Sequence, residues 1–179
     1  MSGSALPAFI TISDRPPVAA GGLDRLYSAA FPTEDLTGLV RALAGLGPDV
    51  LLLTAAIDDE AIGHVAFTLC RVEGPGRTDA LLGPLAVLPE WQKRGVGGAL
   101  VCDGLRRLAA SGVGAVHVLG DPAYYRRFGF APHGGVAPPY PLPDDWAEAW
   151  QSLALDGTRH AGGSLVVPPP WRQPALWSP

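Results

Sequence analysis

A glycine-rich segment at residues 92–98 is the stretch of the chain whose residue types best fit a functional role, namely the binding of an anion. It follows an apolar run at residues 81–88 and precedes a run with helical apolar spacing that extends to Leu108. This order predicts a strand, a loop and a helix. The start of a helix leaves backbone N–H groups unpaired and carries the positive end of the helix dipole. Glycine at positions 95, 97 and 98 removes the side chains that would keep a diphosphate away from those donors.

This loop and a tyrosine element further along the chain together resemble a known family. The pattern Gln92-x-x-Gly95-x-Gly97 resembles the acyl-CoA pyrophosphate motif of the GNAT superfamily of N-acetyltransferases. The sequence Pro-Leu-Ala-Val at residues 84–87 is similar to the family's central strand, and Tyr-Arg-Arg-Phe-Gly-Phe at residues 125–130 is similar to its Tyr-x-x-x-Gly-Phe element. The matches span residues 81–130, a little under a third of the chain. The glycine motif alone is weak, but its combination with the tyrosine element is specific.

The resemblance implies a fold, a cofactor and a set of binding residues. The expected fold is α/β (α+β), the GNAT acyl-CoA N-acyltransferase fold, with a mixed, mostly antiparallel central sheet, splayed central strands and flanking helices. The expected cofactor is acetyl-CoA (coenzyme A), whose pantetheine arm would pair with the central strand like an added strand. The N–H of Val87 is the expected contact of the thioester carbonyl. The predicted cofactor-binding residues are Leu85, Ala86, Val87, Gln92, Lys93, Arg94, Gly95, Val96, Gly97 and Gly98.

Tyr125 is the predicted catalytic residue, because it matches the family's general acid four residues before Gly129. A phenol near its usual pKa of about 10 is protonated at neutral pH and can give its proton to a departing thiolate. Tyr124 is the neighbouring alternative, and simple packing of both tyrosines is a third interpretation. Neither cysteine has a recognisable histidine partner, so no covalent acyl-enzyme is expected. The predicted reaction is direct transfer of an acetyl group from acetyl-CoA to a primary amine of a small molecule or a protein.

Two positions depart from the family pattern. Gly-Asp-Pro at residues 120–122 stands where many family members carry an asparagine that contacts the pantetheine arm. Lys93 replaces a common glycine of the pyrophosphate motif. The first departure puts that asparagine contact in doubt for this chain.

No general base is evident from the sequence. Glu73 and Asp79 could act through a water molecule, although each is interpreted more simply as a surface charge. His64 and His117 lie in predicted strands, where a lone histidine is usually a hydrogen-bonded core group. His133 follows the tyrosine element and ranks below the tyrosine. The acceptor amine needs no strong base if it binds in its deprotonated form.

Composition restricts the class of protein. The chain has 179 residues and a mass of 18.6 kDa, which predicts a single domain over 1–179, with an acyl-CoA-binding core at about 81–130 and a Pro/Trp-rich tail at 168–179. The formal charge of −4 predicts no affinity for nucleic acid or an anionic membrane. Cys70 and Cys102 are too few for a disulfide framework or a zinc site.

With no apolar run long enough to span a bilayer and no recognisable signal peptide, a cytoplasmic location is the default expectation. A homodimer stays open, since dimers are common in the resembled family.

Periodicity and turn signals divide the chain into predicted elements. The predicted strands are residues 8–13, 50–57, 62–72, 78–88, 115–119 and 164–167, with another from residue 130. The predicted helices are residues 18–31, 36–46, 96–111, 122–128 and 144–153. A right-handed crossover would place strand 115–119 parallel to strand 78–88. The tail is either a segment packed on the domain or partly disordered.

Three classes of function compete on these observations. The first is an acetyl-CoA-dependent N-acetyltransferase. The second is an acyl-CoA-binding module without catalysis, acting as a sensor or an interaction partner. The third is a nucleotide-binding protein, which is disfavoured because the loop lacks the Gly-Lys-Ser/Thr ending of a P-loop, and because Leu100 replaces the third glycine of a dinucleotide fingerprint.

Overall fold

The computed structural model describes residues 6–14, 21–74, 76–132, 135–158 and 162–178. Its contacts divide the chain into two compact units. The first comprises residues 1–67 and 83–104, and the second comprises residues 68–82 and 105–179. Strands β3 (Glu60–Val72) and β4 (Asp79–Val87) and helix α3 (Val96–Ala110) contribute residues to both units.

The first unit is built on the strand order β1-β2-β3-β4. Strand β1 (Thr11–Ser13) pairs antiparallel with β2 (Val50–Ile57), and Ile12 lies opposite Ala55. The connection between β2 and β3 is tight, because Asp58 and Asp59 both adopt left-handed backbone angles, with φ of 46° and 66°. The predicted strand at residues 50–57 is confirmed, and β3 begins two residues before the predicted start at Ile62.

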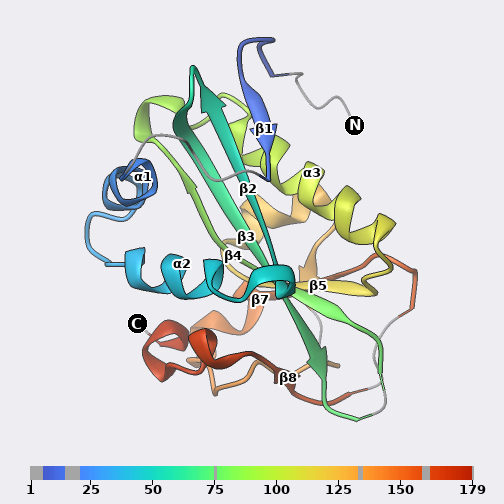
Figure 1. Cartoon of the computed structure of the whole chain (residues 1–179). Coiled ribbons are helices and arrows are strands. Elements are labelled where there is room, and N and C mark those ends of the chain that lie inside the picture. Colours follow the sequence, from blue (N-terminus) through green and yellow to red (C-terminus); the bar gives the residue numbers. More distant parts are fainter. Residues whose placement is uncertain (1–5, 15–20, 75, 133–134, 159–161, 179) are drawn as a thin grey trace. The chain divides into compact units, whose positions relative to one another are not determined.

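Two amphipathic helices cover one side of these strands, and the beginning of α3 lies on the other (Figure 1). Helix α1 (Gly22–Ala30) buries Leu26 and Tyr27, and helix α2 (Thr37–Ala44) buries Leu39, Val40 and Leu43. Both helices confirm the periodicity of the sequence. The first part of the predicted helix 18–31, residues 18–20, lies outside the described residues. An ion pair between Arg41 and Asp24 joins the exposed surfaces of the two helices.

The second unit carries the strand order β4-β5-β7-β6. Strand β5 (Ala115–Leu119) is parallel to β4, as predicted, and their ladder runs from Ala80 opposite Val116 to Leu82 opposite Val118. Strand β7 (Trp150–Ala154) is antiparallel to β5, and the short β6 (Ala131–Pro132) is antiparallel to β7. Strand β8 (Leu165–Val166) pairs antiparallel with the end of β3. Helix α4 (Pro122–Tyr125) continues as a 3-10 helix at Arg126–Phe128, confirming the predicted helical segment.

The predicted helix at residues 144–153 is wrong. The segment forms a 3-10 helix at Asp144–Ala149 and then strand β7. Tertiary pairing overrides the weak helical preference of the segment, since β7 forms five residue pairs with β5. The indole of Trp150 is buried and its N–H donates to the carbonyl of Val136 at 2.7 Å, an interaction that sequence periodicity does not encode.

The tail is packed, which resolves the alternatives left open by its composition. Trp171 and Trp177 are both buried within the second unit. The indole N–H of Trp171 donates to Oγ1 of Thr68, and that of Trp177 donates to the carbonyl of Trp171, each at 3.0 Å. Each buried indole therefore keeps a hydrogen-bond partner, which removes the cost of burying its polar edge. No helix among the described residues is long and apolar enough to cross a membrane.

Gly104 provides a test of packing in the first unit. A Cβ atom at this position in α3 would lie 2.1 Å from the ring of Phe67, whereas a Cβ at Gly38 in α2 would meet no atom within 4 Å. Gly104→Ala should lower the free energy of unfolding by about 2 kcal/mol or more, because the buried ring must move. Gly38→Ala should raise it by about 0.5–1 kcal/mol through helix propensity. Urea denaturation measures both, and equal effects of the two substitutions would contradict this packing.

Candidate functional site

The glycine-rich loop of the first unit joins the end of β4 to the start of α3. After a 3-10 helix at Pro89–Trp91, left-handed angles at Lys93 (φ 58°) and Gly95 (φ 87°) turn the chain into the helix. The side-chain amide of Gln92 donates to the carbonyl of Val87 at 3.2 Å. Gln92 therefore braces the loop against the end of β4.

The start of α3 presents backbone donors. The first turn closes with the N–H of Ala99 bonded to the carbonyl of Gly95 at 2.9 Å. The N–H groups of Val96, Gly97 and Gly98 precede this bond, so they have no partner further back in the helix. Anion binding at this helix start stays a prediction.

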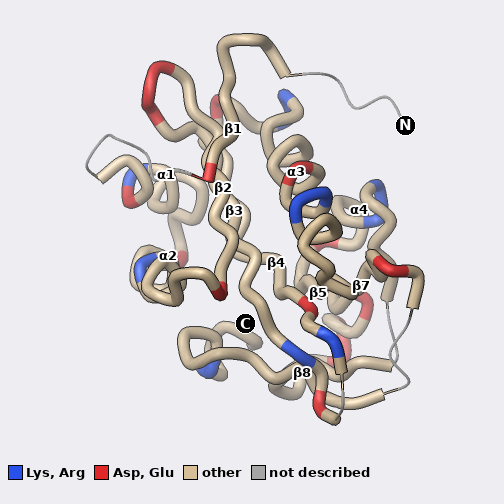
Figure 2. Tube along the Cα trace, turned by 45° about the vertical axis from the view of Figure 1, so that its right-hand side comes forward, with Lys and Arg blue, Asp and Glu red and all other residues tan. Residues whose placement is uncertain are grey.

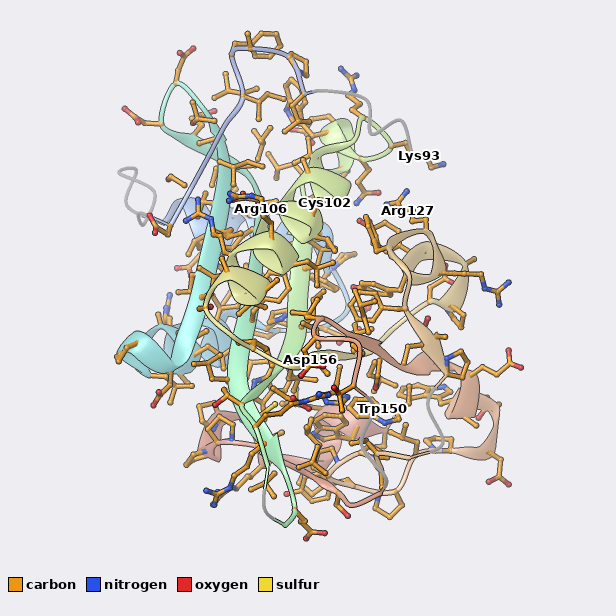
Figure 3. The ribbon with its side chains drawn as sticks, turned by 90° about the vertical axis from the view of Figure 1, so that its right-hand side faces the viewer. Lys93, Cys102, Arg106, Arg127, Trp150 and Asp156 are labelled. Atoms are coloured by element: carbon orange, nitrogen blue, oxygen red, sulfur yellow. The ribbon has the colours of Figure 1, made fainter. Side chains whose placement is uncertain are left out.

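The loop has the charge expected for a diphosphate site. Lys93 and Arg94 are exposed, and residues 92–98 contain no acidic residue (Figure 2). The guanidinium of Arg94 lies 5.3 Å from the ring centre of Trp91, which keeps this cation beside the loop. Side-chain charge, backbone donors and bare glycines therefore fit the diphosphate of an acyl-CoA. Figure 3 labels Lys93 in this loop.

Gly63 of β3 allows the start of α3 to approach the sheet. A Cβ atom at Gly63 would lie 2.9 Å from Cγ1 of Val96 and 3.4 Å from the carbonyl oxygen of Ala86. Val96 is itself buried, and its side chain anchors the first turn of α3 against the sheet. The N–H of Leu88 donates to the carbonyl of Ile62 at 2.9 Å, which ties the end of β4 to the same part of β3.

The remaining predicted contacts involve the backbone at the end of β4. Leu85 and Val87 are half-buried and Ala86 is buried. The preceding Gly83–Pro84 peptide bond is cis, and Pro84 has no N–H to donate to a ladder. The hydrogen-bonded ladder of β4 with β5 ends at Leu82, before these residues. Leu85, Ala86 and Val87 stay the predicted partners of the pantetheine arm.

A buried tyrosine–histidine pair lies beside this part of β4, and the sequence did not single it out as a pair. The hydroxyl of Tyr27 in α1 lies 2.8 Å from Nδ1 of His64 in β3, and 3.4 Å from the carbonyl oxygen of Pro84. Burial lowers the pKa of His64 to about 4 and raises that of Tyr27, so both are neutral at pH 7. The hydroxyl therefore donates and the neutral imidazole accepts. His64 is a satisfied core histidine, as predicted.

Tyr125 lies in the second unit, at the last position of α4. Asp121 caps this helix by accepting the N–H of Ala123 at 2.8 Å. The ring of Tyr125 packs edge-on to Phe130, and Gly120 leaves room for it, since a Cβ there would overlap the ring. Burial raises the pKa of Tyr125, so the phenol keeps its proton well above neutral pH.

The local structure explains the residues that follow Tyr125. Gly129 ends the 3-10 helix with a left-handed φ of 94°, and this turn returns Phe130 to the tyrosine ring. Tyr124, the alternative acid, is half-buried. The guanidinium of Arg127, which Figure 3 labels, lies 4.0 Å from the ring centre of Tyr124. The spacing Tyr-x-x-x-Gly-Phe therefore has a packing reason as well as its family resemblance.

The acidic candidates for a base differ in their surroundings. The prediction of Asp79 as a surface charge is wrong: its side chain is fully buried, with Oδ1 3.2 Å from Nε of Arg77 and Oδ2 2.9 Å from Nε2 of His117. It is the first residue of β4, a position where a single sequence does not distinguish an exposed charge from a buried one. Glu73 is exposed and accepts the N–H of Ser164 at 3.3 Å.

The remaining predictions concern two histidines, the cysteines and metal ligands. His117 is buried and hydrogen-bonded, as predicted, and His133 lies outside the described residues. Cys70 and Cys102 are free thiols. Over the ranges that the structure describes, no group of three or more His, Cys, Asp or Glu side chains could hold a metal ion.

Comparison with known proteins decides the family. Residues 21–130 match the model of the Acetyltransferase (GNAT) family. The chain belongs to this family. The predicted GNAT fold is therefore confirmed, and members of the family use acetyl-CoA as their cosubstrate.

Relatives of this GNAT protein include proteins known from sequence and from crystal structures. The uncharacterized N-acetyltransferase YjhQ of Escherichia coli K12 is 39% identical over 112 residues, which cover 59% of this chain and 61% of YjhQ. YhbS from Escherichia coli, whose crystal structure is in complex with CoA, has 30% sequence identity with this chain. The structural match covers 97% of this chain and 96% of the YhbS chain, with a TM-score of 0.79. A GNAT acetyltransferase from Brucella melitensis in complex with acetyl-CoA is 29% identical, covers 90% of this chain and 97% of that one, and has a TM-score of 0.73.

The buried His64 predicts a pH dependence of stability. Its pKa is lowered to about 4 in the folded state, from about 6.5 in an unfolded chain, so the unfolded state binds a proton first as the pH falls. Its contribution is fully present above pH 6.5 and is lost between pH 6.5 and 4. By pH 5 the loss should reach about 2 kcal/mol. His64→Gln keeps an acceptor for Tyr27 and should lack this component.

Urea denaturation of both proteins at pH 7.5 and pH 5 measures the difference. The pH-dependent loss should be larger in the wild type by about 2 kcal/mol, because all other titrating groups are common to both. The same loss in the two proteins would show that His64 is not held neutral by burial.

Proposed function

We propose that this GNAT protein transfers an acetyl group from acetyl-CoA directly to a primary amine of a small molecule or a protein. The observation that carries the proposal is the start of α3, where Gly95 turns the chain and the N–H groups of Val96, Gly97 and Gly98 precede the first helical hydrogen bond. A helix start of this kind, with Lys93 and Arg94 beside it, suits the diphosphate of coenzyme A.

The end of β4 would bind and orient the cosubstrate. We assign the backbone of Leu85, Ala86 and Val87 to the pantetheine arm, and the N–H of Val87 to the thioester carbonyl. An N–H aimed at this oxygen stabilises the negative charge that develops there in the transition state. Gln92 supports the assignment, because its amide holds the carbonyl of Val87 and so limits rotation of the adjacent peptide groups.

Tyr125 would protonate the leaving group. Bound acetyl-CoA supplies an activated thioester. The neutral acceptor amine would form the new C–N bond as the C–S bond breaks, and Tyr125 would give its phenolic proton to the departing thiolate. The nitrogen would lose its extra proton to solvent, and the phenolate of Tyr125 would regain a proton from solvent. Burial supports this role in one respect, since it keeps the phenol protonated throughout the neutral range.

The second candidate is an acyl-CoA-binding module without catalysis, and one observation favours it. The raised pKa of Tyr125 makes the phenol a weaker acid than an ordinary tyrosine, so proton transfer to a thiolate is less favourable. A module of this kind would keep the diphosphate loop and bind acetyl-CoA without turnover.

Tyr125→Phe separates the two candidates. Removing the proton donor should lower kcat for amine acetylation by about 100-fold or more, while the phenyl ring keeps its packing against Phe130. The increase in melting temperature produced by acetyl-CoA should be unchanged, because the diphosphate loop is intact. Thiol release over a panel of amines measures turnover. Undiminished kcat in the variant would remove Tyr125 from the mechanism, and binding without turnover in the wild type would favour the sensor module.

Arg94→Glu tests the diphosphate loop. Reversing this charge should weaken coenzyme A binding by about 10-fold at low salt, and less at high salt, because the interaction is electrostatic and exposed. Arg71→Glu makes the same change at an exposed position in β3 of the second unit and should leave the affinity unchanged. Isothermal titration calorimetry at two salt concentrations measures both. Equal weakening by the two substitutions would point to net charge alone, and a melting temperature that responds to NAD or ATP but not to coenzyme A would overturn the proposal.

A further inference from the structure

The second unit contains a serine, a histidine and an aspartate joined by hydrogen bonds. Oγ of Ser152 lies 2.7 Å from Nδ1 of His117, and Nε2 of the same ring lies 2.9 Å from Oδ2 of Asp79. Asp79 is fully buried and His117 is 1% exposed, whereas Ser152 is only half-buried. The order of nucleophile, base and carboxylate is the one used for nucleophilic catalysis by serine. The two ring nitrogens are exchanged relative to the serine proteases, because Nδ1 faces the serine and Nε2 faces the carboxylate.

The register of the sheet brings the three side chains to one face. His117 of β5 lies directly opposite Ser152 of β7, and on its other side it lies opposite Leu81 of β4. Asp79 is two residues before Leu81, so it points to the same side of the sheet. Cross-strand and diagonal neighbours on one face are close enough to hydrogen-bond.

The environment sets the direction of these hydrogen bonds. A buried carboxylate must accept, so Nε2–H of His117 donates to Asp79. Nδ1 then carries the lone pair and accepts the hydroxyl proton of Ser152. Arg77 provides a compensating charge, with Nε 3.2 Å from Oδ1 of Asp79. Trp150, which Figure 3 labels, stacks on the imidazole with ring centres 5.8 Å apart and planes 10° apart, and this contact holds the ring in its orientation.

Ser152 and His117 both line a cavity of about 240 Å³, with all of its lining residues in the second unit. The wall is mixed: Ala115, Val136 and Leu153 contribute apolar side chains, and His117, Ser152 and Thr158 contribute polar groups. Arg77, whose guanidinium also binds Asp156, is the only Lys or Arg among the lining residues that the structure describes. The volume is below the usual range of drug-sized sites, so it suits a short acyl group.

We propose that Ser152 is the nucleophile of a second site that hydrolyses short-chain carboxylic esters through an acyl-serine intermediate. Oγ of Ser152 attacks the ester carbonyl while Nδ1 of His117 takes its proton. The C–O bond to the alcohol then breaks, and the imidazolium returns that proton to the departing alkoxide. Water attacks the acyl-serine with His117 again as base, which releases the carboxylic acid and restores Ser152. Asp79 holds the ring and stabilises its positive charge in both steps.

This activity is independent of acetyl-CoA and goes beyond the proposed amine acetylation. It needs no part of the first unit, since Asp79, His117 and Ser152 all belong to the second.

The test uses the full chain without coenzyme A. A fluorophosphonate probe should label one serine, and mass spectrometry of the digested protein should place the adduct on Ser152. The same protein should hydrolyse p-nitrophenyl acetate with burst kinetics. Ser152→Ala should abolish the label and reduce hydrolysis by about 100-fold or more, with an unchanged melting temperature. Ser28→Ala, at an exposed serine of α1, should leave labelling and hydrolysis as in the wild type.

His117→Gln tests the base, and it should slow labelling by about 100-fold. If this buried substitution prevents folding, the Ser152 and Ser28 variants still decide the proposal. An unlabelled wild-type protein, or an adduct on any residue other than Ser152, would overturn it. Loss of labelling in Ser28→Ala would overturn it as well, because the reactive hydroxyl would then lie outside the cavity.

Discussion

The close approach of β3, β4 and α3 in the first unit depends on the missing side chain of Gly63. A methyl group at this position would press on Val96 and on the carbonyl of Ala86, the residues that begin α3 and lie near the end of β4. With only a hydrogen atom there, Val96 is buried under the first turn of the helix and the glycine loop is held at the end of β4. Packing beneath the loop therefore sets the direction of the N–H groups in the first turn of α3. The glycines of the loop itself leave its outer side free of side chains.

Buried polar groups specify both units beyond their apolar contacts. In the first unit, the hydroxyl of Tyr27 joins α1 to His64, and burial keeps the imidazole neutral. In the second unit, the buried carboxyl group of Asp79 contacts Arg77 and His117. A misaligned strand would leave these groups without partners at a cost of about 1–3 kcal/mol each, and more for a charged group. Such groups penalise alternative registers more strongly than exchangeable apolar side chains would.

Sequence reasoning succeeded where a local pattern matched a local structure. The apolar run at residues 50–57 became β2, the helical spacing after the glycine loop became α3, and the crossover rule gave the parallel pairing of β5 with β4. It failed at residues 150–154, where pairing with β5 produced a strand instead of the end of a helix. It also failed at Asp79, because His117, one of the two partners of the buried carboxyl group, lies 38 residues away in the sequence.

The sequence by itself determined the features that lie within short segments, namely a glycine loop before a helix and a tyrosine four residues before a glycine. It also determined the family resemblance, which the comparisons confirmed. These features depend on backbone angles and on neighbours a few residues apart. Only the tertiary structure decided which polar side chains meet. Ser152, His117 and Asp79 are 35 and 38 residues apart along the chain, and strand register alone brings them within hydrogen-bonding distance. Register is a property of paired strands, and no single strand contains it.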